Sequence, residues 1–237
     1  MFEQLSARIF EGDLAPGEAL PPERELCQVL GVNRGAIREA LKRLAQAGLV
    51  DVRHGGKSKV LDYRRNGGLG LLPYLLFSAG DRLDFGVARS VMEMRAALAP
   101  DLARLCAQRA NPEARAELRR LVRALADCGE DVDARQLVAL ELWDVIAAGS
   151  GNIAYQLAFN TLRETYLHVR ELLAQALADE MKADADFEAL VAAIEASDAS
   201  AARDAAARVV DRGTSRVLAL LEMVRGLQSP PISPKES

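Results

Sequence analysis

Two short helical patterns joined by the three-residue turn Gly31-Val32-Asn33 constrain the fold of this chain more than any other feature. The first pattern begins at Pro21, and the second begins after Asn33 and ends at Gly48. Proline suits the first turn of a helix, asparagine caps a helix start, and glycine ends a helix. This spacing predicts a helix-turn-helix, whose second helix enters a groove of DNA.

Apolar residues recur at the spacing of an amphipathic helix in both patterns and also in residues 1–11. One face of each of these three helices is therefore expected to point inward. The inner positions are Phe2, Leu5, Ile9 and Phe10, then Leu26, Val29 and Leu30, then Ile37, Ala40, Leu41 and Leu44.

The periodicity changes after Gly48. Two short runs of β-forming residues, 49–52 and 57–61, flank a Gly55-Gly56 turn, which predicts a β-hairpin. A hairpin directly after a recognition helix is a wing. Residues 1–62 are therefore predicted to form a winged helix-turn-helix domain.

The charge of the chain is divided unevenly. Residues 33–65 hold nine Lys or Arg against three acids, a net charge of +6 in a protein whose total is −4, so the remainder carries −10. A basic region on an acidic protein indicates a DNA-binding module beside a part that does not bind DNA. The alternative is a basic face that is merely solvated.

Three arginines are candidate DNA contacts. Arg34 and Arg38 lie in the first turns of the second helix, opposite its apolar stripe, where a recognition helix presents side chains to base edges. Arg24, at the start of the preceding helix, is placed to reach the DNA backbone. A guanidinium group fits both phosphate oxygens and the O6/N7 edge of guanine. Alternatively, Arg24 pairs with Glu25 or another acid, and the other two are solvated surface charges.

His54, Gly55 and Gly56 form the predicted wing tip. Glycine lets a backbone approach DNA closely, and an imidazole is narrow enough to enter a minor groove. The alternative is that His54 is an ordinary turn residue.

The second half of the chain is helical throughout. After a polar linker at 63–68, we expect an all-helical domain at 69–227 and a disordered Pro/Ser-rich tail at 228–237. The fold class is thus mainly α, with a small β-hairpin wing. The expected helices are 69–78, 84–109, 112–127, 133–148, 152–177, 184–197 and 199–227.

Composition narrows the remaining possibilities. The chain has two histidines, too few for a metal site built on several imidazoles, and three cysteines that are far apart in sequence. No apolar stretch approaches the roughly 18 residues that a membrane span needs, and the chain does not start like a secretory signal. We therefore expect a cytoplasmic protein without a membrane partner or a cofactor, while a metal site built on carboxylates alone stays possible.

The run from Leu20 to Val60, LPPERELCQVLGVNRGAIREALKRLAQAGLVDVRHGGKSKV, resembles the winged helix of the GntR family of transcription regulators. The resemblance implies that Arg24, Arg34, Arg38 and the wing at His54-Gly55 contact DNA. Gly35 stands where relatives often have Thr or Ser, which removes a hydroxyl contact at this position of the interface.

The helical half resembles the effector domain of the FadR subfamily of GntR regulators, through SVMEMRAALAPDLARLCAQRA and AAGSGNIAYQLAFNTLRETYLHVR. The resemblance implies that residues 69–227 form an effector-binding and dimerisation domain folded as an antiparallel bundle. Many members hold a divalent metal with one Asp and three His. Those positions correspond here to Leu140 for the Asp, Asp144 for the first His, and the neighbourhoods of Phe187 and Val209 for the others. No imidazole remains, so we expect no transition metal.

This pattern is similar to the metal-free branch of the subfamily, which implies an acyl-coenzyme A or another lipophilic anion as effector. Arg95 is the expected partner of an anionic group, and Asp144, Tyr155 and Tyr166 are expected to line the same space. Alternatively, Arg95 forms a buried ion pair with an acid such as Asp144. Trp143 is expected in the core, and Asn152 as the cap of the helix that follows it.

Three classes of function were weighed. The preferred one is a homodimeric regulator that binds an inverted-repeat operator in double-stranded DNA under the control of a small-molecule effector, with a small organic acid as the alternative effector. An enzyme is disfavoured because the sequence has no nucleophile–base motif, phosphate-binding loop or metal cluster. A DNA-binding architectural protein without a ligand stays open.

Overall fold

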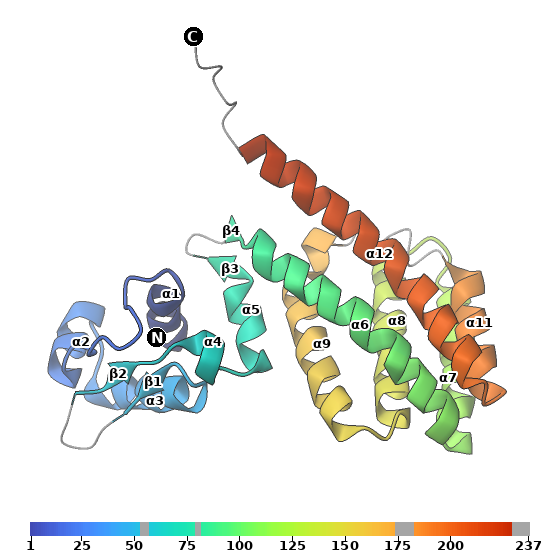
Figure 1. The fold of residues 1–237 in the computed structure, drawn as a ribbon, viewed down its shortest axis with the longest axis horizontal. Coiled ribbons are helices and arrows are strands. Elements are labelled where there is room, and N and C mark those ends of the chain that lie inside the picture. The colour runs from blue at the N-terminus through green and yellow to red at the C-terminus, as the bar shows by residue number, and fades with distance from the viewer. Residues whose placement is uncertain (53–56, 79–81, 174–182, 229–237) are drawn as a thin grey trace, which may run out of the picture. The chain divides into compact units, whose positions relative to one another are not determined.

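The computed structural model describes residues 1–52, 57–78, 82–173 and 183–228 and divides the chain into two compact units, Met1–Val87 and Ala88–Ser237. Figure 1 shows the small strands confined to the first unit and long helices in the second. This confirms the expected fold class, mainly α with a small hairpin. None of the helices in the described part of the chain has the length and hydropathy required to cross a bilayer.

The first unit contains the predicted helix-turn-helix. Its helices are α1 (Phe2–Phe10), α2 (Glu23–Leu30) and α3 (Arg34–Gln46). Gly31 ends α2 in the left-handed conformation, with φ at 66°, and the Asn33 side chain caps α3 by accepting a hydrogen bond from the Ala36 amide at 2.9 Å. The expected apolar stripes enter one core, except that Val29 is exposed and Phe10 and Leu30 are only partly buried.

The wing is an antiparallel pair of short strands, β1 (Val50–Asp51) and β2 (Lys59–Val60), in which Val50 lies opposite Val60. Residues before α2 add to the outer side of β2, because the Leu20 amide donates to the Ser58 carbonyl and the Val60 amide donates to the Glu18 carbonyl, at 2.8 and 2.9 Å. The hairpin predicted from the change of periodicity is therefore confirmed. Its tip, residues 53–56, lies outside the described residues.

Residues 62–76, which we call the connector, differ from the expected flexible linker and first bundle helix. They form α4 (Tyr63–Asn66), a 3-10 turn (Leu69–Leu71) and α5 (Leu72–Leu75), followed by the strands β3 (Phe77–Ser78) and β4 (Arg82–Leu83). The expected single helix at 69–78 was wrong, because glycine and proline at positions 70 and 73 disfavour a continuous helix here.

The connector belongs to the first unit because it packs on α1. The rings of Phe2 and Tyr74 meet edge to face at 5.1 Å, and those of Phe10 and Tyr63 at 5.2 Å. Leu71 is buried in the same core as the recognition helix. The two compact units therefore divide near residue 87, about twenty residues later than the linker expected at 63–68.

The second unit is a bundle of helices whose described bounds are close to those expected from the sequence. Its described helices are α6 (Phe85–Arg109), α7 (Pro112–Asp127), α8 (Val132–Gly149), α9 (Ile153–Leu173), α11 (Asp184–Glu195) and α12 (Ala199–Gln228). Consecutive helices such as α7 and α8, or α11 and α12, pack against each other around a core that includes Leu118, Leu142, Ile146 and Phe187.

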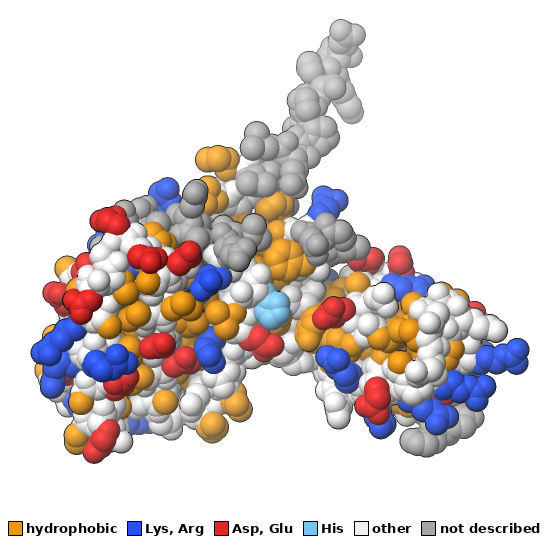
Figure 2. Space-filling view, turned by 180° about the vertical axis from the view of Figure 1, so that it is seen from behind, with side chains coloured by type: hydrophobic (Ala, Val, Ile, Leu, Met, Phe, Trp, Pro, Cys, Tyr) orange, Lys and Arg blue, Asp and Glu red, His pale blue; other side chains and the backbone are white. Residues whose placement is uncertain are grey.

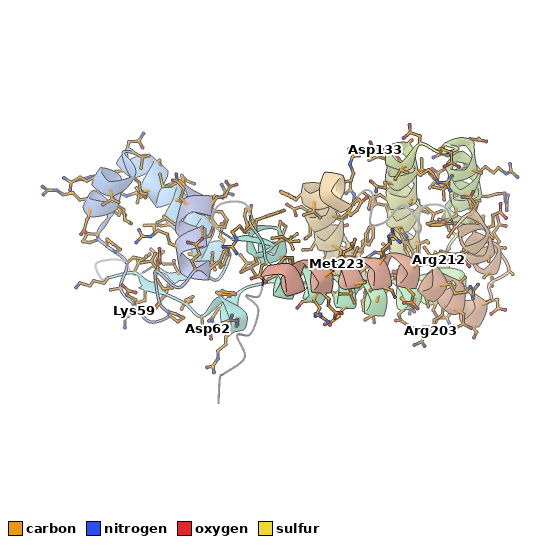
Figure 3. The ribbon with its side chains drawn as sticks, turned by 90° about the horizontal axis from the view of Figure 1, so that it is seen from above. Lys59, Asp62, Asp133, Arg203, Arg212 and Met223 are labelled. Carbon is orange, nitrogen blue, oxygen red and sulfur yellow. The ribbon has the colours of Figure 1, made fainter. Side chains whose placement is uncertain are left out.

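The helix α12 runs beside α6, as both Figure 1 and Figure 3 show; Arg203, Arg212 and Met223 mark its course in Figure 3. The Arg89 guanidinium pairs with Glu222 at 3.0 Å. Arg115 on α7 holds the ends of other helices: it donates to the carbonyls of Ala107 and Glu195, at 3.0 and 2.7 Å. A cation at helix C-termini satisfies carbonyls that have no partner within the helix.

Among the glycines described in the winged helix, Gly48 should be the one whose replacement lowers stability most. Its φ is +73°, and a Cβ built on it would lie 2.1 Å from the carbonyl oxygen of Asn66 in the connector. We expect Gly48→Ala to lower the free energy of unfolding by about 2 kcal/mol or more. The matched control is Gly31→Ala, which has a φ of +66° but open space around it and should cost about 1 kcal/mol. Calorimetry of the full chain measures both, and equal losses would show that the connector does not press on this turn.

Cys106 should be the least reactive of the three thiols. It is buried, and burial raises its pKa to about 11, so almost no thiolate exists at pH 8. Cys27 and Cys128 are only partly buried. In native protein treated with iodoacetamide at pH 8, mass spectrometry should find Cys106 alkylated at least about tenfold more slowly than the other two, with the difference lost in denaturant. Equal native rates would contradict the packing of α6 against α8 at this residue.

Candidate nucleic-acid interface

The recognition helix α3 has one buried and one exposed side. Ile37 and Leu44 are completely buried, whereas Arg34, Arg38 and Lys42 are exposed. Because the apolar side is anchored in the core, the guanidinium groups of the first turns must point to solvent. The cap at Asn33 fixes the start of the helix, and Arg34 follows it directly.

Arg38 is not an isolated surface charge. Its Nε atom lies 3.1 Å from a carboxylate oxygen of Glu23, at the start of α2. Both side chains are well exposed, so the pair contributes little to stability, but it orients the Arg38 fork. Glu23 was not predicted as part of this site, although its place in the PPERE run was the available signal.

Arg24 and Arg34 are exposed, and no ion pair is seen for either within the part of the chain that the structure describes. The pairing of Arg24 with Glu25 that we considered is thus not observed there. Gly35 lies between Arg34 and Arg38, and a Cβ on it would approach the capping oxygen of Asn33 to 3.2 Å. A larger residue here would therefore press on the cap.

The basic surface extends from α3 to the wing. Lys57 and Lys59 are exposed on β2 or just before it, and Figure 3 labels Lys59 on its strand. Figure 2 shows Lys and Arg side chains gathered along one edge of the face it draws of this unit. His54 and Gly55, predicted at the wing tip, lie outside the described residues.

Other basic residues of the +6 region have structural roles. The Arg43 guanidinium lies over the ring of Phe2 at 4.7 Å, and that of Arg64 over Tyr63 at 5.1 Å. Arg65 lies 3.6 Å from Asp62. Such cation–π and ion-pair contacts occupy these groups. The candidate interface therefore comprises four residues of the basic region, Arg34, Arg38, Lys57 and Lys59, together with Arg24, which precedes it.

In the helical unit, Arg95 and Asp144 have different partners. The Arg95 guanidinium donates to the Val210 carbonyl and the Thr214 hydroxyl on α12, at 3.3 and 3.4 Å. Asp144 pairs with Arg163 on α9 at 3.2 Å. Burial raises the pKa of the Asp144 carboxyl, while Arg163 opposes and Glu141 adds to the shift. Among the described residues, the alternative that Arg95 forms an ion pair with Asp144 is therefore not observed, because Asp144 pairs with Arg163.

The two predicted tyrosines lie partly buried on α9. The pKa of the Asp101 carboxyl is lowered, chiefly by the hydrogen bond from Arg104 and further by the Tyr155 hydroxyl, while burial opposes the shift. Tyr166 is also half-buried. Asn152 caps α9, accepting from the amides of Ala154 and Tyr155 at 3.1 and 3.3 Å, as expected.

The positions that correspond to metal ligands in many FadR-like proteins are mostly apolar and packed. Phe187 and Val209 are completely buried in the core of the bundle, and Leu140 packs against it. Trp143 is 7% exposed in the same core, as predicted. Among the described residues, no group of three or more potential metal ligands comes together.

Two buried polar side chains of α8 were not predicted. Arg135 is 2% exposed and donates to the Leu125 and Gly129 carbonyls and to Asp184. Gln136 is also 2% exposed, but neither atom of its carboxamide has a hydrogen-bond partner. Their position within the otherwise apolar stripe of this helix was the signal available in the sequence.

Two family models match the chain. Residues 1–60 match the model described as bacterial regulatory proteins, gntR family, and residues 90–212 match the FCD domain. The chain is 40% identical over 221 residues to the HTH-type transcriptional regulator Mce2R of Mycobacterium tuberculosis, which covers 93% of this chain and 91% of that protein. It is 33% identical over 171 residues to the fatty acid metabolism regulator protein of Serratia proteamaculans, covering 70% and 68%.

A solved structure shares the fold. It comes from a study of Lar, which controls the expression of the Listeria monocytogenes agr system. The TM-score is 0.59 and the sequence identity 14%, and the match covers 93% of this chain and 96% of that one. At this identity the likeness supports the arrangement of the fold alone. An exposed pair of arginines on a capped recognition helix, a wing and the two matched models together show that the chain belongs to the gntR family of bacterial transcription regulators: a DNA-binding protein with an FCD effector domain, not an enzyme.

Proposed function

We propose that the protein binds an inverted-repeat operator as a homodimer and that an acyl-coenzyme A or another lipophilic anion controls this binding. A dimer with twofold symmetry presents two recognition helices to two half-sites of a palindrome. It would act in the cytoplasm, where the chromosome is. The observation that carries the proposal is the exposure of Arg34 and Arg38 on the first turns of the capped helix α3.

The roles of the DNA-contacting residues follow from their positions. Arg34 is closest to the start of α3, so it is proposed to bind the edge of a guanine. Arg38 lies one turn later and is oriented by Glu23, and it is proposed to bind a neighbouring base or phosphate. Arg24 and the wing residues Lys57 and Lys59 are proposed to contact phosphates. His54 and Gly55 keep their proposed place in the minor groove, and Gly35 leaves room for a close approach of the helix to DNA.

The proposed effector is a long-chain acyl group with an anionic head. Support comes from the resemblance to the metal-free FadR branch and from the similarity to a fatty acid metabolism regulator protein. The apolar residues that replace metal ligands, Phe187 and Val209, favour a lipophilic ligand over a metal-bound acid. Arg95 is proposed as the partner of the anionic group, with Asp144, Tyr155 and Tyr166 nearby on α8 and α9.

The DNA proposal is tested with a duplex operator that the protein selects from a random-sequence pool. Arg34→Ala should weaken binding to the operator by about 1–3 kcal/mol, because one bidentate contact to guanine is lost, and should change binding to random DNA much less. The control is Arg203→Ala, an exposed arginine of α12 in the other unit, which should leave both affinities unchanged. Fluorescence anisotropy at fixed salt measures them. Equal losses on both DNAs would show a phosphate contact only.

The effector proposal is tested by thermal shift with oleoyl-coenzyme A. A ligand bound only by the folded protein raises the melting temperature; at 100 times its Kd the gain is about 2.7 kcal/mol. Arg95→Ala should remove most of this shift while operator affinity stays within about twofold. If the unliganded variant loses operator binding as well, Arg95 is structural and supports α12 through Val210 and Thr214.

A further inference from the structure

The buried carboxamide of Gln136 is the one polar group in the described core whose chemistry nothing in the fold uses. The side chain is 2% exposed, and neither Nε2 nor Oε1 has a hydrogen-bond partner. A primary amide buried without partners costs stability, on the order of 1–3 kcal/mol. Such a group in a well-packed core calls for an explanation, and an absent ligand is one of the few available.

The position of Gln136 on α8 connects it with the proposed effector region. At helical spacing, Gln136, Leu140, Trp143 and Ala147 form one stripe of α8. Leu140 is the position that corresponds to a metal-ligating aspartate in related proteins, and Trp143 and Ala147 belong to the core of the bundle. Gln136 therefore faces the interior one turn before the residue that would bind metal in those relatives.

The chemistry of the Gln136 carboxamide favours a neutral ligand group over a charged one. Arg135, the residue before it on α8, already donates to two backbone carbonyls and to the carboxylate of Asp184. A carboxylate placed against a neutral amide alone would lose its hydration without compensation. An uncharged carbonyl accepts from Nε2 at much lower cost, and an amide can also donate to Oε1.

From this we infer that Gln136 reads the uncharged carbonyl group of an acyl ligand, a thioester or an amide, and discriminates against the free carboxylate. The inference rests on the proposed effector function and refines it: Arg95 would hold the distant anionic group, and Gln136 the linkage between that group and the acyl chain. Gln136 is thus assigned as a specificity-determining residue of the FCD domain.

The test compares oleamide, oleoyl-coenzyme A and oleate, each below its critical micelle concentration, on the full-length wild type and two variants. Gln136→Leu keeps a similar volume and removes both hydrogen-bonding atoms. Gln136→Glu keeps the shape and adds a charge. The readouts are the melting temperature without ligand and the Kd for each compound.

For the wild type we expect oleamide and oleoyl-coenzyme A to bind at least about tenfold more tightly than oleate. Gln136→Leu should bind oleamide about tenfold more weakly, since one to two hydrogen bonds are lost, with the preference over oleate removed. Without ligand, the same variant should melt about 2–6 °C higher than the wild type, because the unpartnered amide is gone. Gln136→Glu should lower the melting temperature and abolish binding of all three compounds, because it buries an unpaired charge.

Three outcomes would overturn the inference. If Gln136→Leu melts at or below the wild-type temperature and still prefers oleamide to oleate, the Gln136 amide does not recognise the ligand carbonyl. If the wild type prefers oleate to oleamide, a charged group is recognised, and the proposed effector function survives without this residue. If none of the three compounds changes the melting temperature of the wild type while operator binding is normal, the protein has no acyl effector. Both the proposed effector and the role of Gln136 are then wrong.

Discussion

The burial of one face of α3 is the constraint on which the rest of the DNA-binding unit depends. Ile37 and Leu44 are completely enclosed by the first core, and this fixes the rotation of the helix about its own axis. Once that rotation is set, Arg34 and Arg38 have no position except in solvent. The cap at Asn33 sets where the helix begins, and Glu23 sets the direction of one guanidinium fork. The exposure of the two guanidinium groups therefore follows from the packing of apolar side chains on the opposite side of the helix.

The same core extends beyond the winged helix into the connector. Leu71 enters it, Tyr74 meets Phe2, and Asn66 lies so close to Gly48 that only a glycine fits there. The end of the recognition helix and the segment leading to the FCD domain are thus one packed body. A displacement of the connector would therefore be transmitted to α3, since packed side chains transmit displacement more directly than a flexible linker does.

Charge is used differently in the two units. Around α3, Arg34 and Arg38 stay exposed with at most one surface partner. In the helical unit, the partly buried Arg115 donates to carbonyls at helix ends, and the buried Arg135 pairs with Asp184. Against this background Gln136, buried and without a partner, is the exception. This exception is the observation on which the proposed recognition of an uncharged ligand carbonyl rests.

Much of this could be predicted from the sequence, because the signals were local. The turn at Gly31, the cap at Asn33, the hairpin after Gly48 and the bounds of the bundle helices all depend on neighbouring residues. The connector was misjudged because its order comes from tertiary contacts: polar residues 62–68 look like a linker until Phe10 and Tyr63 are seen to meet.

The pairing of Arg38 with Glu23, fifteen residues away, and the separate partners of Arg95 and Asp144 were invisible for the same reason. Phe187 and Val209 could be placed by resemblance, but their complete burial required the fold. Helical periodicity marks which face of a helix is inward; it does not say which buried polar group will find a partner there.

Amide hydrogen exchange of the full-length protein, with and without its selected operator, tests the central claim most directly. The account predicts that DNA slows exchange at the start of α3, residues 34–38, and along β2 at Lys59 and Val60, and leaves α7 and α11 unchanged. If DNA instead protects those bundle helices and leaves the start of α3 as open as in the free protein, the recognition helix has been wrongly assigned.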